Sequence, residues 1–367
     1  MVAKRALFLK KFFIVFCIFV GAGYVWHERS ARIEIVLPKN FLVETAYGTT
    51  MIDEPVLIEL IHSPAMQRLK KVNQYGIVYF VRPHQKYNRY QHSLAVFYLL
   101  RHFGASLEEQ VAGLLHDVSH TAFSHVADYL HGVVTNKYAY QDTQFAWYLD
   151  RSGILSILKK YNLEQVAGFA IEEKYQLLKP NLPNLGADRL EYNLYGGYLE
   201  GWLTQEEMVT ILNHVKIQNG QWFFDDSEYA KKFAEVSVNL SVHNWNSAFY
   251  VFINTMMANV LKRALTLGLV TMHELQFSID EEIWNKLISA QDSEMQELIM
   301  KIKDQDSSYK LGSAEQYDLY QECRFKGIDP LVETESGLVL LSSVDSEFKQ
   351  FFEHAKSLCH GQYIIYT

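Results

Sequence analysis

A histidine and an aspartate stand side by side at positions 116 and 117, within the run GLLHDVSHTAFSHVADYL. An imidazole next to a carboxylate can offer one nitrogen and one oxygen ligand to a single divalent metal ion. His92 comes earlier in the chain and Asp188 later, and both residue types bind such ions. A lone His-Asp pair also arises by chance in a chain with 14 histidines, so its surroundings decide the interpretation.

The doublet stands at the end of a stretch with helical periodicity. In LEEQVAGLLHDV the apolar residues recur at helical spacing, which predicts a helix with one buried face. On such a helix His116 and His120 share a face, and Asp117 lies one turn from His120. His125 and Asp128 follow with the same three-residue spacing. Because unpaired carboxylates are costly to bury, this group predicts a metal site rather than histidines of an ordinary core.

Four short motifs follow one another in the first half of the chain. They are the opening YGT, the helix SPAMQRLK, the helix RYQHS and the run HDVSHTAFSH. In this combination the chain resembles the dNTP triphosphohydrolase branch of the HD superfamily of metal-dependent phosphohydrolases, over residues 45–200 and more weakly over 230–265. The resemblance implies one divalent metal ion (Fe, Mn, Zn, Ni or Mg), and its ligands would be His92, His116, Asp117 and Asp188.

The resemblance also implies roles for residues around the metal. The catalytic positions of the family correspond to His120, His125 and Asp128. The positions that contact the substrate correspond to Gln74 and Tyr75 for the sugar and base, and to Arg89, Arg189 and Tyr192 for the phosphates. The implied activity is hydrolysis of a nucleotide, foremost a (deoxy)nucleoside triphosphate, or of another small phosphate ester.

The chain departs from this pattern in two places. Where the family has a His-Glu pair, this chain has Gln141 and Asp142, and an amide cannot donate a titratable proton. Proton transfer would then fall to His120 or His125. The helical segment 236–265 also lacks, over its first half, the cations that clamp phosphates in the family. A phosphomonoesterase, another nucleotidase, and a catalytically impaired nucleotide sensor or membrane-anchored interaction protein with the HD fold therefore remain alternatives.

The composition indicates a large folded body. Hydrophobic residues make up 49% of the chain and charged residues 21%, and no linker or repeat is visible. We expect a mostly α fold, with an HD-type helical bundle over 40–265, a small β-hairpin at the Asn219-Gly220 turn, and a helical C-terminal extension over 266–367. The expected helices span 57–72, 107–118, 142–153, 249–265, 279–291, 317–325 and 345–358.

The charge and the N-terminus suggest where the protein acts. With a net charge of −8 the chain has no overall electrostatic attraction to nucleic acid and no clear nucleic-acid surface, whereas a homo-oligomer is compatible with the sequence. Four basic residues lie in the first 11 positions and precede the apolar run FFIVFCIFVGAGYVW. This order predicts a signal anchor within residues 1–30, with a separate apolar helix over 6–26 that holds the protein at a membrane and the catalytic body on the non-cytoplasmic side. Cleavage of the segment, giving a secreted or periplasmic protein, is the alternative.

Overall fold

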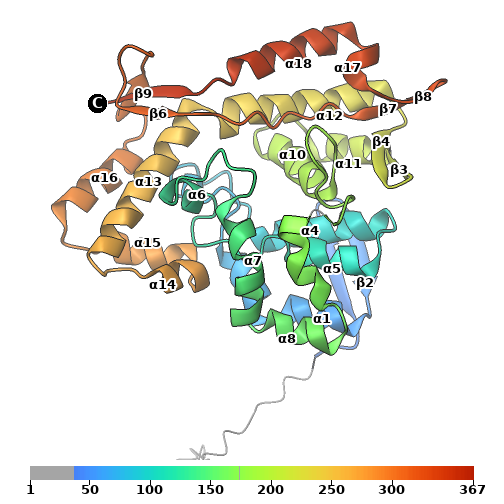
Figure 1. Ribbon diagram of the computed structural model, residues 1–367, viewed down its shortest axis with the longest axis horizontal. Helices are drawn as coiled ribbons and strands as arrows, with labels where there is room; N and C mark the ends of the chain where they lie inside the picture. The colour runs from blue at the N-terminus through green and yellow to red at the C-terminus, as the bar shows by residue number, and fades with distance from the viewer. Residues whose placement is uncertain (1–36, 173) are drawn as a thin grey trace, which may run out of the picture. The chain divides into compact units, whose positions relative to one another are not determined.

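In a computed structural model, which describes residues 37–172 and 174–367, the helix that carries His92 packs against the helix that leads to the His-Asp doublet (Figure 1). The first of them, α4 (Arg89–His102), starts with a capping box at Asn88. The second, α5 (Leu107–Leu115), approaches it closely at Gly113, where a Cβ would lie 2.2 Å from a leucine methyl of α4. A side chain at position 113 would therefore force Leu100 to move, so the glycine favours the close packing of the two helices.

The other helices surround this pair. They are α1 (Pro55–His62), α2 (Pro64–Arg68), α3 (Val78–Val81), α6 (Val126–Leu130), α7 (Tyr140–Arg151), α8 (Ile154–Lys160), α9 (Phe169–Glu172), α10 (Ala187–Leu199), α11 (Gln205–Asn213), α12 (Ser227–Asn239), α13 (Ala248–Thr266), α14 (Met272–Phe277), α15 (Asp280–Ile288), α16 (Ser293–Lys303), α17 (Leu341–Val344) and α18 (Ser346–Leu358). Short 3-10 helices are η1 (Leu69–Lys71) and η2 (Glu164–Gly168), and a π-helical stretch, η3 (Leu240–Trp245), continues α12.

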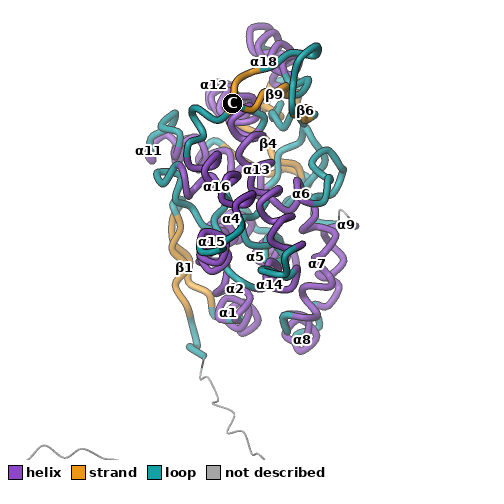
Figure 2. The backbone as a smooth tube through the Cα atoms, turned by 90° about the vertical axis from the view of Figure 1, so that its left-hand side faces the viewer, coloured by secondary structure: helices purple, strands orange, loops and turns teal. Residues whose placement is uncertain are grey.

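Small sheets lie at the edges of the helical body. The strands are β1 (Phe41–Thr45), β2 (Gly48–Ile52), β3 (Val215–Gln218), β4 (Gln221–Phe224), β5 (Tyr309–Leu311), β6 (Leu319–Gln321), β7 (Leu331–Thr334), β8 (Gly337–Leu340) and β9 (Gln362–Tyr366). β1 pairs with β2, and the other sheets have the orders β3-β4-β7-β8 and β5-β9-β6. The β1–β2 hairpin and β9 lie at opposite ends of the body (Figures 1 and 2). The parallel pairing of β4 with β7 joins the C-terminal part of the chain to its middle.

The segment with the His-Asp doublet lies between two hydrophobic clusters. The first cluster contains the buried residues of α1, α4, α5, α10 and α12, together with Val118. The second is built around α13 and α16 and includes Phe123 and Val126. The turns that contain residues 116–125 therefore span the junction of the two clusters, and packing at both of their ends fixes their path.

The structure confirms the mostly α fold and the expected hairpin. Ile217 pairs with Trp222, and Asn219 and Gly220 both have the positive φ of a tight hairpin turn. Residues 57–72 are not one helix but form α1, α2 and η1, because Pro64 starts a new helix after Ser63.

Two other expected helices were partly or wholly wrong. The helix expected over 107–118 ends at Leu115, so the doublet lies at its C-terminus and in the turn beyond it. The helix expected over 317–325 is absent, because Leu319–Gln321 pairs with Gln362–Tyr366 as β6 and residues 322–330 run extended to β7. We call residues 322–330 the strap.

The described residues contain no helix that is long and apolar enough to cross a membrane. The apolar segment predicted over 6–26 lies outside the described residues. The anchor, and the placement of the body on the non-cytoplasmic side, therefore stay predictions.

Candidate metal and phosphate site

Four side chains from three parts of the fold converge on one point. His92 Nε2 lies 3.1 Å from His116 Nε2, 3.2 Å from Asp188 Oδ1 and 3.5 Å from Asp117 Oδ2. His116 Nε2 lies 3.5 Å from an oxygen of each of the two aspartates. His92, His116 and Asp117 are buried and suitably placed to share a metal ion, and Asp188 is 14% exposed beside them. The structure thus brings together the four ligands that the sequence predicts.

The hydrogen bonds of the two histidines orient their free nitrogens toward this point. His92 Nδ1 contacts the Glu191 carboxylate, and His116 Nδ1 lies 2.7 Å from the Gly113 carbonyl oxygen. Since carboxylates and carbonyls only accept, each Nδ1 is a donor, which leaves a lone pair on each Nε2 for a ligand. Two lone pairs 3.1 Å apart, beside two carboxylates, repel one another unless a metal ion or a proton lies between them.

The electrostatics of the cluster also require positive charge. Burial alone would lower the pKa of His92, but the charges of Glu191, Asp188 and Asp117 raise it to about 10. Burial would raise the pKa of Asp117, but the neighbouring Arg89 and His116 hold it well below its usual range. The carboxylates are therefore ionised, and a divalent cation satisfies the nitrogen and oxygen donors present.

Glu191 is a functional residue that the sequence reasoning missed. It is fully buried, contacts His92, and accepts a hydrogen bond of 2.6 Å from the Tyr87 hydroxyl. The Tyr47 hydroxyl adds longer contacts to the same residue. The available signal was its position one helical turn after Asp188 in DRLE, which places both carboxylates on one face of α10.

Glu191→Gln is expected to weaken metal binding by about 10–100-fold. The amide keeps the shape of the side chain and an acceptor for His92, but the negative charge that increases the basicity of the imidazole is lost. Isothermal titration of metal into metal-free protein measures the change in Kd. Tyr47→Phe is the control, since it removes a hydroxyl from Glu191 and leaves the contact with His92 intact. An unchanged Kd in Glu191→Gln would contradict this role.

The turn after the doublet has an unusual backbone that other residues hold in place. Phe123 and Ser124 have φ angles of 61° and 54°, which are uncommon for residues other than glycine. The Phe123 amide donates to a carboxylate oxygen of Asp280 at 2.8 Å, and Ser124 Oγ accepts from Arg89 Nε at 2.7 Å. These contacts fix the backbone immediately before His125.

The three predicted catalytic residues lie together beside the metal ligands. His125 Nδ1 and Asp128 Oδ2 are 2.9 Å apart, and the rings of His120 and His125 meet edge to face at 5.0 Å. Burial, with the charge of Arg89, lowers the pKa of His120 to about 3, so His120 is neutral at physiological pH. His125 is the more accessible histidine, with 36% of its side chain exposed, and it faces an ionised Asp128. The pair suited to proton transfer is therefore His125 and Asp128.

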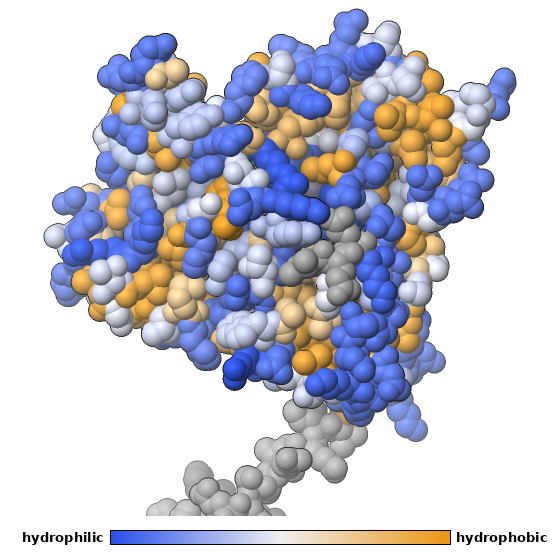
Figure 3. All heavy atoms as spheres, in the orientation of Figure 1, coloured by the Kyte–Doolittle hydropathy of each residue, from blue (hydrophilic) through white to orange (hydrophobic). Residues whose placement is uncertain are grey.

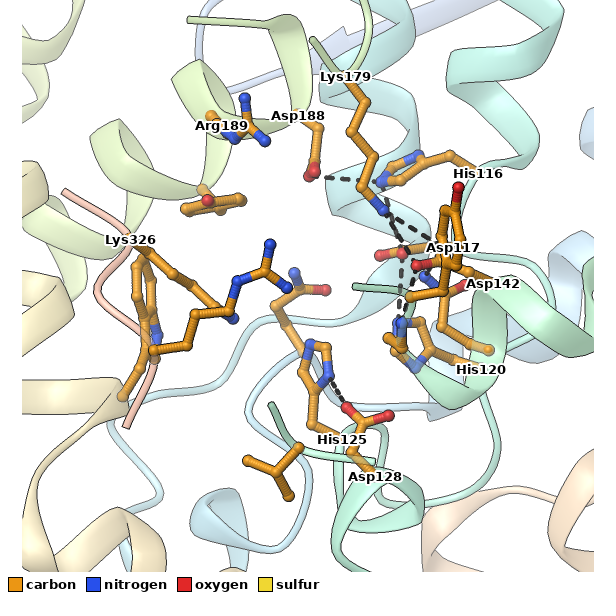
Figure 4. Close-up of a pocket in the computed structure, with 18 of the residues that line it drawn as sticks. His116, Asp117, His120, His125, Asp128, Asp142, Lys179, Asp188, Arg189 and Lys326 are labelled. Carbon is orange, nitrogen blue, oxygen red and sulfur yellow. Dashed lines mark hydrogen bonds and ion pairs between the residues drawn. The ribbon is translucent and has the colours of Figure 1, made fainter. Parts of the chain in front are cut away.

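A cavity of about 300 Å³ opens beside these residues (Figure 4). Hydrophilic side chains gather near the middle of the face that Figure 3 shows. All five predicted substrate residues line the cavity: Gln74, Tyr75, Arg89, Arg189 and Tyr192.

The contacts of the two predicted phosphate-binding arginines differ. Arg89 is almost fully buried and pairs with the metal ligand Asp117, so in this structure it supports the metal site. Arg189 donates through one nitrogen to the carbonyls of Pro180 and Asn184. Its guanidinium still lines the cavity, next to Asp188 (Figure 4).

Comparison with known proteins places the chain in a family. Residues 89–169 match the HD domain family. The chain is 32% identical over 311 residues to the uncharacterized protein YdhJ of Bacillus subtilis (strain 168), over 84% of this chain and 93% of that protein. It is 29% identical over 263 residues to the metal-dependent phosphohydrolase cns2 of Cordyceps militaris, over 70% of this chain and 75% of that protein. The chain belongs to the HD-domain superfamily of metal-dependent phosphohydrolases.

Two more distant similarities are to a solved phosphohydrolase structure and to a deoxynucleoside triphosphate triphosphohydrolase. A phosphohydrolase structure from Bacteroides thetaiotaomicron has a TM-score of 0.65 at 16% identity, over 89% of this chain and all of that one, which is a likeness of fold. The deoxynucleoside triphosphate triphosphohydrolase SAMHD1 of Gallus gallus is 37% identical over 121 residues. That match covers 26% of this chain and 20% of the relative.

This HD phosphohydrolase has Gln141 where the family has a histidine, and the structure shows which residues the glutamine contacts. Gln141 is buried, donates to Asp142 Oδ1 at 2.9 Å, and accepts from Ser119 Oγ. Asp142 also pairs with Lys179 at 3.2 Å, and Lys179 lines the cavity above His116 and Asp117 (Figure 4). Lys179 therefore adds a cation that no sequence motif indicated.

Further cations come from a part of the chain in which the sequence showed no motif. Arg324 and Lys326, both in the strap, line the cavity. These two residues add positive charge to the cavity that the sequence reasoning did not identify. In the family the cations belong to the helix that corresponds to the segment 236–265, whereas here they come from a distant extended segment that folds back over it.

Proposed function

We propose that this HD phosphohydrolase hydrolyses a nucleotide, and that the substrate class is the (deoxy)nucleoside triphosphates. The observation that supports it best is one cavity lined both by the metal ligands and by Arg189, Arg324 and Lys326. Among the described residues these three cations form no ion pair with a carboxylate. In a chain with a net charge of −8, several cations in one cavity that no carboxylate neutralises favour a strongly anionic ligand.

The cavity also has groups suited to a nucleoside. Gln74 Oε1 is buried and accepts no hydrogen bond from any described residue, so a ligand hydroxyl or amino group could satisfy it. Tyr192 and Trp245 meet edge to face at 5.0 Å and offer aromatic surface. These features support a ligand that has a base or sugar as well as phosphates.

The residues present also suggest how the reaction is divided among them. A divalent ion held by the four ligands would lower the pKa of water and neutralise charge on the phosphoryl group. Arg89 holds Asp117 in place, and Arg189 is positioned to bind phosphate oxygens beside Asp188. His125, oriented by Asp128, would transfer the proton, because Gln141 cannot.

Measurement of the products would test the substrate class. Metal-loaded, full-length protein is incubated with the four dNTPs, with a deoxynucleoside monophosphate, and with p-nitrophenyl phosphate. We expect a deoxynucleoside and tripolyphosphate from the dNTPs, with little turnover of the single-phosphate esters. The name of the SAMHD1 relatives favours this bond, although the match covers only part of each chain.

Two other outcomes would replace the proposal. Turnover of p-nitrophenyl phosphate without turnover of triphosphates would identify a phosphomonoesterase. No phosphate release from any substrate at full metal occupancy would favour an impaired nucleotide sensor, for which the amide of Gln141 in place of an imidazole is the supporting observation.

A further inference from the structure

The strap is held against the body by side chains that are themselves buried. Ser241 Oγ accepts from the Lys326 amide at 2.8 Å, and Ser237 Oγ accepts from the Ile328 amide at 3.1 Å. Both serines are fully buried and lie four residues apart, so they share one face. Figure 1 shows the segment between β6 and β7 running along α12. The strap backbone is thus fixed along its length rather than lying loosely on the surface.

A third residue fixes the strap where its cations reach the cavity. The Asn246 side chain accepts from the Arg324 amide at 3.2 Å and donates to the Arg324 carbonyl at 3.0 Å. This two-way contact reproduces the pairing of a β-strand and leaves the Arg324 side chain free to turn away. Asn246 itself lines the cavity, so the contact lies at the edge of the site.

The strap cations lie in the cavity without an opposing carboxylate. Arg324 donates to the carbonyl of Asn136 at 3.0 Å, and the Lys326 ammonium lies 5.9 Å from the centre of the Trp245 ring. Neither forms an ion pair in the part of the chain that the structure describes. Burial lowers the pKa of Lys326, and the charge of Asp128 offsets this only in part. An anion bound beside Lys326 would offset the cost of keeping its ammonium charged.

Different kinds of side chain line the two ends of the cavity. Figure 4 shows Lys326 on the wall opposite His116 and Asp117, with Arg189 and His125 between them along the sides. A phosphate at the metal ligands would be bound by residues at that same end of the cavity. The cations of the strap would therefore bind another part of the ligand.

We propose that Arg324 and Lys326 form a second anion subsite, which binds a condensed phosphate chain at a phosphoryl group other than the one at the metal ligands. An arginine fork and a lysine ammonium are the usual protein ligands of phosphate oxygens. The inference deepens the proposed function and rests on it for the position of the reacting phosphate. It predicts that the protein discriminates condensed phosphates from single phosphates through the strap.

Binding of inorganic probes would test this subsite independently of turnover. Tripolyphosphate and phosphate are titrated into the full-length protein in excess Mg²⁺, so that chelation by the probe is the same for every variant. In the double variant Arg324→Gln, Lys326→Gln we expect at least a roughly tenfold loss of tripolyphosphate affinity, since charge-assisted hydrogen bonds are lost. Phosphate affinity should stay within about twofold, because the metal end of the cavity is unchanged.

Two further variants complete the test. Lys349→Gln removes an exposed lysine of α18 that does not line the cavity, and its tripolyphosphate affinity should equal that of the unaltered protein. The double variant Ser237→Ala, Ser241→Ala keeps both cations but releases the strap, and we expect a severalfold loss, with thermal unfolding used to confirm a folded protein. Wild-type affinity for tripolyphosphate in either double variant would overturn the subsite or its support by the serines.

The result does not depend on the substrate proposal. If no nucleotide is hydrolysed, the proposed function fails, but the loss of tripolyphosphate binding still identifies the subsite. If dNTPs are hydrolysed and the cation variant binds tripolyphosphate as tightly as the unaltered protein, the subsite is wrong and the proposed function stands. Equal affinity of the unaltered protein for phosphate and tripolyphosphate would also refute the subsite.

Discussion

Asp117→Ala should remove the bound metal and phosphate release together. The carboxylate lies within 3.5 Å of both ligand histidines and is held by Arg89, so its loss takes away a ligand and the charge that balances the ion. We expect metal affinity to fall by more than the roughly 100-fold that loss of a supporting residue can cost. Metal content per chain by mass spectrometry and phosphate release measure the two effects.

This substitution also leaves Arg89 buried without its partner, and breaking such a pair costs about 3–5 kcal/mol. Asp117→Asn fills the same volume and separates loss of the ligand from loss of the fold, with circular dichroism as the check. Asp306→Ala, at an exposed carboxylate that does not line the cavity, should keep full metal and activity. Full metal content in a folded Asp117 variant would contradict the metal site.

His125→Ala should reduce kcat by at least about 100-fold while the metal stays bound. His125 is not among the metal ligands, but it lies at the cavity and is oriented by Asp128 at 2.9 Å. Asp128→Asn should have a smaller effect, because the imidazole remains and only its partner changes. Steady-state kinetics and metal content are measured on the same preparations.

The control for this pair is His84→Ala, at an exposed histidine outside the cavity, which should behave as the unaltered protein. His120→Ala then distinguishes the contribution of His120 to turnover from that of His125. If His125→Ala and His120→Ala are both fully active, proton transfer by this cluster is refuted. Loss of metal in His125→Ala would instead show that this histidine supports the metal site.

The sequence indicated the four residues that converge in the structure, because they occur within motifs in the order of the family that the chain resembles. Its account of how they converge was incomplete. The periodicity of 107–118 predicted a helix that carries the doublet, whereas α5 ends at Leu115. A local pattern could not show this, because the turns that follow are fixed by distant residues such as Asp280 and Arg89.

Local sequence patterns could not reveal which cations line the cavity. The sequence showed that the segment 236–265 lacks the family's cations over its first half, but it could not show that Ser237 and Ser241 bind the strap that carries Arg324 and Lys326. The first residues of the strap, 322–325, were predicted as the end of a helix over 317–325. The helix does not form because Leu319–Gln321 pairs as β6 with the distant strand β9. Long-range pairing of this kind overrides local propensity and leaves no short motif.

Titration of metal-free protein with a divalent ion tests the central claim most directly. Mn²⁺ or Fe²⁺ is added stepwise to the full-length chain, and bound metal and phosphate release from a dNTP mixture are measured at each step. The structure predicts that hydrolysis is absent without metal, rises in proportion to occupancy and saturates at one ion per chain, since the four ligands surround one point. Hydrolysis by the metal-free chain, or activity that does not follow occupancy of a single site, would contradict this account.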